Sequence, residues 1–111
     1  MLSRKRKAGV LMSWDTIRIN EEEKYIGKGN SIIIDLRRPE EYAAGHICGA
    51  VSIPYEELEH CKCMLRKYCK IFLYCERGNT SMLAARDLDR EGYPAVNLYG
   101  GVRVYRGKLV K

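Results

Sequence analysis

The fold is decided by one stretch in the middle of the chain, Lys70-Ile71-Phe72-Leu73-Tyr74-Cys75-Glu76-Arg77-Gly78-Asn79-Thr80-Ser81. Residues 71–74 form a continuous apolar run, which predicts a buried strand. A short polar loop follows, and we expect a helix over 79–91 that ends at Gly92, with Pro94 behind it. Cys75 would then stand at the carboxyl end of a strand and face the positive end of a helix dipole. A thiolate is stabilised at such a position.

Strands and helices alternate on both sides of this stretch. Further strands are predicted at residues 16–19, 31–36, 50–53 and 96–99. Further helices are predicted after Asn20, over 39–45, and over 55–68, where Leu58, Cys61, Leu65 and Tyr68 share one face. Such alternation indicates an α/β fold with a mostly parallel sheet, in which ligands bind outside the carboxyl ends of the strands.

Length and charge limit the organisation of the chain. Its 111 residues allow one domain with a modest core, so we expect a basic, disordered tail over 1–13 and one domain over 14–111. The formal net charge is +6, and four positive charges lie together at residues 4–7. Aromatic residues do not interleave with basic ones, a pattern that nucleic-acid binding would favour. The apolar run at 8–12 is too short for an export signal, and no segment has the length of a membrane span. We therefore expect a cytoplasmic protein without nucleic-acid or membrane partners.

The chain has five cysteines and no export signal, which favours free thiols over a disulfide framework. Cys61 and Cys63 point in nearly opposite directions on a helix, so they cannot share one metal ion there. We expect Cys61 in the core and no metal or organic cofactor. A role for another cysteine in resolving an oxidised or persulfidated Cys75 stays open.

The loop after Cys75 has the composition of an anion-binding turn. Gly78 permits a positive φ, so that successive backbone N–H groups can converge above the cysteine sulfur. Arg77 adds a positive charge nearby, and Glu76 is expected to point outward because its charge opposes an anion. These features predict a nucleophilic Cys75. The alternative is a buried structural cysteine, and the polar residues that follow argue against burial.

The last two residues of the quoted stretch carry hydroxyl groups. Thr80 and Ser81 could cap the helix or donate to the bound anion. The position of Ser81 also argues against one rival chemistry. Cysteine-dependent phosphatases need an arginine six residues after the cysteine to hold phosphate bidentately, and Ser81 stands there.

Several separated motifs together resemble the rhodanese-like sulfurtransferase domain over nearly all of residues 16–107. The motifs are Ile34-Asp35-Leu36-Arg37, Pro39-Glu40-Glu41-Tyr42, Gly45-His46-Ile47-Cys48-Gly49-Ala50, Cys75-Glu76-Arg77-Gly78-Asn79-Thr80, Gly92-Tyr93 and Gly100-Gly101. The resemblance implies a five-stranded, mostly parallel sheet flanked by helices on both faces. It implies that Cys75 carries the sulfur and that Glu76, Arg77, Gly78, Asn79 and Thr80 form the substrate loop. Cys48, where the family usually has proline, and Tyr105, where it usually has tryptophan, are departures outside that loop.

The activity that the resemblance implies is transfer of sulfane sulfur from a small anionic donor to a thiol, cyanide or protein acceptor. Arg77 and Thr80 are similar to the loop residues of members that use thiosulfate, whereas many single-domain members end the loop with arginine. One alternative is a carrier that delivers persulfide to a protein partner with little turnover on free thiosulfate. Another is a non-catalytic scaffold, against which the presence of Cys75 argues. The chain could act as a monomer or a homodimer.

Three other polar residues follow the motifs closely. Asp35 and Arg37 lie after a predicted strand and either brace the active loop or form a structural ion pair. His46 is either a general base or a structural histidine that hydrogen-bonds the backbone.

Overall fold

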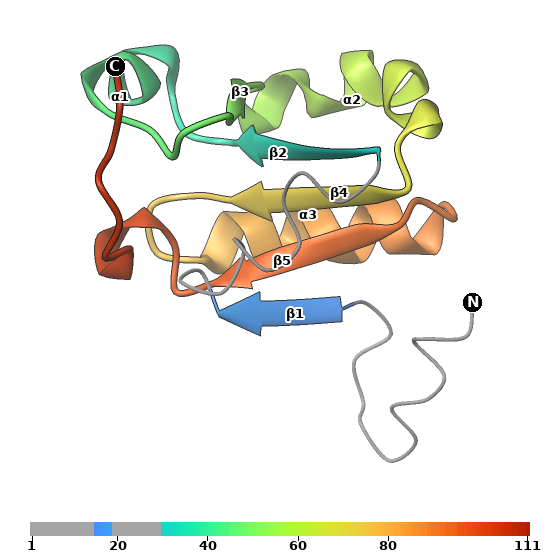
Figure 1. The fold of residues 1–111 in the computed structure, drawn as a ribbon. Coiled ribbons are helices and arrows are strands. Elements are labelled where there is room, and N and C mark those ends of the chain that lie inside the picture. Colours follow the sequence, from blue (N-terminus) through green and yellow to red (C-terminus); the bar gives the residue numbers. More distant parts are fainter. Residues whose placement is uncertain (1–14, 19–29) are drawn as a thin grey trace.

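The computed structural model describes residues 15–18 and 30–111 of the chain. In this part of the chain a sheet is formed by β1 (Asp15–Arg18), β2 (Ser31–Asp35), β3 (Val51–Ser52), β4 (Lys70–Tyr74) and β5 (Ala95–Tyr99). The strands lie in the order β1-β5-β4-β2-β3, and every neighbouring pair is parallel (Figure 1). The predicted α/β fold with a parallel sheet is thereby confirmed. β4, which precedes Cys75, is the middle strand.

Successive residues of β2 and β4 face opposite sides of the sheet, as the two-residue period of a strand requires. One apolar cluster contains Ile32, Ile34, Ile71 and Leu73 together with Leu58, Leu65, Ala84, Ala85 and Leu88. The other contains Ile33, Phe72, Tyr74, Val96 and Leu98, against which Tyr42, Val102 and Tyr105 pack. Because both faces of the central strands are buried, these strands read as continuous apolar runs rather than alternating ones.

The helical elements lie between the strands along the chain and after the last strand. They are α1 (Pro39–Ala44), η3 (Tyr55–Glu57), α2 (Leu58–Cys61), η4 (Lys62–Lys67), α3 (Asn79–Arg90) and η5 (Val102–Val104), where η denotes a 3₁₀ helix. α1 begins at a proline and is followed by Gly45, as the sequence predicts. α3 ends one residue earlier than predicted, and its apolar side packs on the sheet.

The single helix predicted over 55–68 is wrong. The backbone at Glu57 (φ −94°, ψ −7°) and Cys61 (φ −103°, ψ −1°) departs from regular α-helical geometry, and the segment is divided into η3, α2 and η4. The predicted apolar face is nevertheless retained, because Leu58 and Leu65 are buried and Cys61 and Tyr68 pack against the same cluster. Periodicity reports which face is buried, and tertiary packing can override the hydrogen-bonding pattern along the chain.

Two sequence predictions, the tail over 1–13 and the helix after Asn20, lie outside the described residues. The first strand is found at Asp15–Arg18, close to the predicted 16–19. At the other end, the chain returns to α1, where the backbones of His46 and Val110 exchange two hydrogen bonds of 2.8 Å (Figure 1). Within the described part of the chain, no helix has the length and hydropathy needed to cross a membrane.

Candidate active site

Cys75 follows β4 directly and lies at the carboxyl edge of the sheet. Gly78 precedes α3 with φ +101°, the positive value that the sequence predicts. The tight turn lets the backbone N–H of Gly78 donate to Cys75 Sγ at 3.1 Å, and the N–H of Ser81 donates at 3.3 Å. Two backbone donors from the loop and the first turn of α3 therefore point at one sulfur, which favours negative charge on that atom.

The expectation that Cys75 escapes burial is wrong. Its relative exposure is 6%, whereas Arg77 and Asn79 are exposed. The backbone of the loop turns over the cysteine, and Cys75 lines a pocket together with Glu76, Arg77, Asn79 and Thr80. Burial and access to a pocket are therefore compatible at this residue.

Ser81 lies within the first turn of α3, whose N-cap residue is Gly78, so Ser81 is not the cap of this helix. Its Oγ lies 2.6 Å from Oδ1 of the buried Asn97, 3.2 Å from the carbonyl oxygen of Gly78 and 3.6 Å from Cys75 Sγ. The serine hydroxyl thus ties the first turn of α3 to β5 beside the sulfur. Asn97 was missed by the sequence analysis, although a lone amide within an apolar strand was a visible signal of a buried hydrogen bond.

The segment after β5 holds the start of the loop through its backbone. The N–H of Val102 donates to the carbonyl of Cys75 at 2.9 Å, and the N–H of Arg103 donates to that of Glu76 at 3.0 Å. Gly101 makes this approach possible, because a Cβ there would lie 2.5 Å from the carbonyl oxygen of Glu76. The Gly100-Gly101 motif therefore serves close contact with the active loop.

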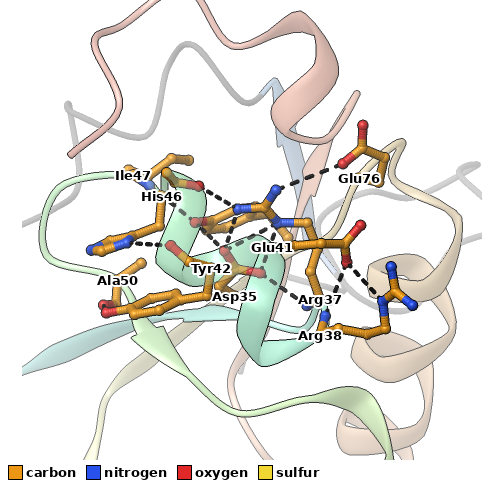
Figure 2. Close-up of polar contacts among 11 residues, drawn as sticks. Asp35, Arg37, Arg38, Glu41, Tyr42, His46, Ile47, Ala50 and Glu76 are labelled. Atoms are coloured by element: carbon orange, nitrogen blue, oxygen red, sulfur yellow. Dashed lines mark hydrogen bonds and ion pairs between the residues drawn. The ribbon is translucent and has the colours of Figure 1, made fainter. Parts of the chain in front are cut away.

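Arg37 links the end of β2 to the same loop (Figure 2). Its Nη2 lies 2.8 Å from Asp35 Oδ2 and 2.7 Å from the carbonyl oxygen of Gly45, and its Nη1 lies 3.7 Å from Glu76 Oε1. Burial opposes the charge of Arg37, but the hydrogen bond and charge of Asp35 raise the pKa of the guanidinium above its ordinary value. The structural ion pair expected of Asp35 and Arg37 is present, and Arg37 also contacts the loop through Glu76. Glu76 is half-exposed and turns one oxygen toward Arg37.

Tyr74 extends this network beneath the loop. Its hydroxyl donates to Asp35 Oδ2 at 2.8 Å and accepts from the N–H of Ile47 at 3.0 Å. Burial raises the pKa of Tyr74 above its ordinary value. His46 lies nearby, with its ring stacked on Tyr42 and its Nδ1 2.9 Å from the carbonyl oxygen of Tyr42 (Figure 2). The backbone hydrogen bond predicted for a structural His46 is therefore present.

A pocket of about 400 Å³ opens above Cys75. It is lined by Leu36, Arg37, Arg38, Glu41, Tyr55, Glu56, Cys75, Glu76, Arg77, Asn79 and Thr80. The predicted loop residues are thus brought together around one cavity, although Gly78, Ser81 and Asp35 lie behind its wall. The rest of the lining, with Arg38, Glu41, Tyr55 and Glu56, was missed because those residues come from two other segments. The remaining cysteines, Cys48, Cys61, Cys63 and Cys69, are free as predicted, and none lines this pocket.

The chain is similar to proteins of known family. The uncharacterised protein YqhL of Bacillus subtilis is 36% identical over 92 residues, which cover 82% of this chain and 73% of the relative. A tRNA sulfurtransferase of Desulfurococcus amylolyticus is 37% identical over 83 residues, 75% of this chain but only 16% of that protein. The crystal structure of a rhodanese-like domain protein from Staphylococcus aureus matches with a TM-score of 0.75 and 27% identity, covering 87% of this chain and 98% of the other.

The family model described as rhodanese-like domain matches residues 19–108, which include β2 to β5, the cysteine loop and α3. The match extends over most of the chain and agrees with the strand, cysteine, loop and helix arrangement described above. This chain therefore belongs to the rhodanese-like domain family.

Proposed function

We propose that this protein transfers sulfane sulfur through a persulfide on Cys75. The observation that carries the proposal is the pair of N–H donors, from Gly78 and Ser81, that point at Cys75 Sγ at the base of an open pocket. Family membership and a relative named as a sulfurtransferase support general sulfur transfer. Thiosulfate is the proposed donor because Arg77 places a positive charge at the pocket.

In the first half-reaction, the Cys75 thiolate attacks the outer sulfur of thiosulfate. A new S–S bond forms to Cys75, the S–S bond of thiosulfate breaks, and its electron pair leaves with sulfite. Arg77 stabilises the departing dianion, and the backbone N–H groups of the loop hold the charge that remains on the persulfide.

In the second half-reaction, the thiolate of an acceptor attacks the outer sulfur of the Cys75 persulfide. The S–S bond to Cys75 breaks, the cysteine regains its thiolate, and the acceptor leaves as a persulfide. Charge and sulfur balance without an oxidant. The residues that take part are Cys75 and its loop, and no step calls for a metal or an organic cofactor.

The second candidate is a carrier that delivers persulfide to one protein partner. The charges that line the pocket favour it, because Arg37, Arg38 and Arg77 are balanced by Glu41, Glu56 and Glu76. A pocket dedicated to a small anion would carry a net positive charge. Turnover with free cyanide separates the two candidates, since a dedicated carrier would load sulfur but release it slowly.

The test is the intact mass of the reduced protein after incubation with thiosulfate. We expect the wild type and a Cys48→Ser variant to gain one sulfur atom each and a Cys75→Ser variant to gain none. Cys48 is the matched control because it is an exposed free thiol outside the pocket. No gain on the wild type, with Cys75 still accessible to a thiol reagent, would exclude thiosulfate as the donor.

A further inference from the structure

The pocket at Cys75 is larger than a small sulfur anion requires. Its volume of about 400 Å³ lies within the range of sites for small organic molecules, roughly 300–1,000 Å³. Part of the lining comes from the loop, and Leu36, Arg38, Tyr55 and Glu56 come from the segments that follow β2 and β3. This second group of residues supplies neither of the two N–H donors to the Cys75 sulfur, so it is free to recognise the group attached to an acceptor sulfur.

Most of the charged groups that line the pocket are already paired. Arg37 faces Asp35 and Glu76, and Arg38 lies 3.8 Å from Glu41. Among the charged residues that line the pocket, Arg77 and Glu56 form no ion pair with any side chain of residues 30–111. They carry opposite charges, and Arg77 belongs to the loop after β4 whereas Glu56 belongs to η3.

Glu56 is held in place by the backbone that precedes it. The N–H of Ile53 donates to the carbonyl of Asp35 at 3.1 Å, and the N–H of Tyr55 donates to that of Leu36 at 3.0 Å. The first turn of η3 is therefore anchored to the same end of β2 that positions Arg37. A carboxylate on an anchored turn offers a defined partner for a cation.

We propose that Glu56 binds the ammonium group of a small acceptor thiol, so that the preferred acceptor is an aminothiol whose sulfur reaches Cys75. Arg77 serves the anionic donor, and Glu56 serves the cationic acceptor that follows it in the second half-reaction. The inference rests on the proposed function for its place in the reaction, but the binding preference itself is testable without persulfide.

The test is thiol–disulfide exchange on the reduced protein. The Cys75 thiolate attacks cystamine, which carries two ammonium groups, or neutral 2-hydroxyethyl disulfide. The S–S bond of the reagent breaks, half of the reagent stays on Cys75, and the other half leaves as a thiolate. Rates are followed by the mass of the peptide that contains Cys75. Intrinsic differences between the reagents cancel when their rate ratio is compared between variants.

In Glu56→Gln we expect the ratio of the cystamine rate to the neutral-reagent rate to fall about two- to fivefold, the size of a solvent-exposed ion pair. Glu57→Gln is the matched control, because it removes the same charge from the same 3₁₀ turn at a residue that does not line the pocket. The control ratio should equal that of the wild type. The difference should shrink in 1 M salt, where screening is strong.

An unchanged ratio in Glu56→Gln would overturn the inference, as would an equal fall in both variants. The same comparison in turnover uses cysteamine against 2-mercaptoethanol as acceptors of the persulfide, and the same fall in kcat/KM is expected. Failure to form any persulfide, combined with a lowered exchange ratio, would refute the proposed function and leave the ammonium site standing.

Discussion

Replacing Gly101 by alanine should disturb the active loop without touching the cysteine or any charged group. Gly101 has φ +70° and ψ −178°, a region that only glycine occupies readily. An added Cβ would lie 2.5 Å from the carbonyl oxygen of Glu76 and 2.7 Å from the backbone nitrogen of Arg77. Since these neighbours are backbone atoms, the peptide between Glu76 and Arg77 has to move.

Two costs add in this variant. The backbone strain is about 1–3 kcal/mol, and forcing a methyl group into a packed contact costs about 1–3 kcal/mol. The smaller entropy of an alanine-containing unfolded chain offsets about 0.4–1 kcal/mol. We therefore expect the free energy of unfolding to fall by about 3 kcal/mol, which a domain of ordinary stability survives.

Gly92→Ala is the matched control, because Gly92 has φ +89° and an added Cβ would meet no atom within 4 Å. It should lose about 1 kcal/mol from the positive φ alone. Urea unfolding of both variants gives the stability difference, and the rate of persulfide formation under folding conditions gives the effect on the loop. Only in Gly101→Ala should the rate of persulfide formation fall, by tenfold or more. Equal stabilities of the two variants, or a wild-type rate in folded Gly101→Ala, would refute the claim that Gly101 positions the loop.

Two further predictions concern the network behind the loop. Because burial raises the pKa of Tyr74, the folded state keeps the phenol proton at a pH where the unfolded chain has already lost it. The free energy of unfolding should therefore be constant with respect to Tyr74 below pH about 10 and fall above it by about 1.4 kcal/mol per pH unit. Tyr74→Phe should remove this part of the alkaline slope. It should also lower the free energy of unfolding at pH 7 by about 1–3 kcal/mol, because Asp35 and the N–H of Ile47 lose a hydrogen-bond partner. Urea titrations between pH 7 and 11 measure both effects, and an unaltered slope would contradict the raised pKa of Tyr74. Arg37→Met should cost about 3–5 kcal/mol, since it leaves the fully buried carboxylate of Asp35 without its cation. Arg38→Met, which removes a solvent-exposed pair, should cost less than about 1 kcal/mol in the same unfolding assay.

Local chemistry accounts for what could be predicted from the chain. The apolar run before Cys75 predicts β4, the glycine three residues later predicts the positive φ, and Pro39 with Gly45 predicts the limits of α1. In each case the deciding residues lie within a few positions of one another. Steric and hydrogen-bonding preferences over that range are properties of the peptide itself.

Two local predictions failed where packing decided the outcome. The helix predicted over 55–68 is divided into η3, α2 and η4, while Leu58 and Leu65 remain buried in the same apolar cluster. Cys75 is buried although its neighbours in sequence are polar, because the loop closes over it. Burial is a property of the assembled layers, and composition around a residue reports it only indirectly.

The sequence by itself determined the α/β fold, the family and the place of the candidate cysteine and its loop after a buried strand, because each of these signals is carried by short runs of adjacent residues. Only the tertiary structure decided what surrounds that loop. Asn97 meets Ser81, Gly101 contacts the Glu76 peptide, and Glu56 lines the same pocket as Arg77. These pairs are separated by many residues along the chain, and they meet because parallel strands bring their carboxyl ends to one edge of the sheet.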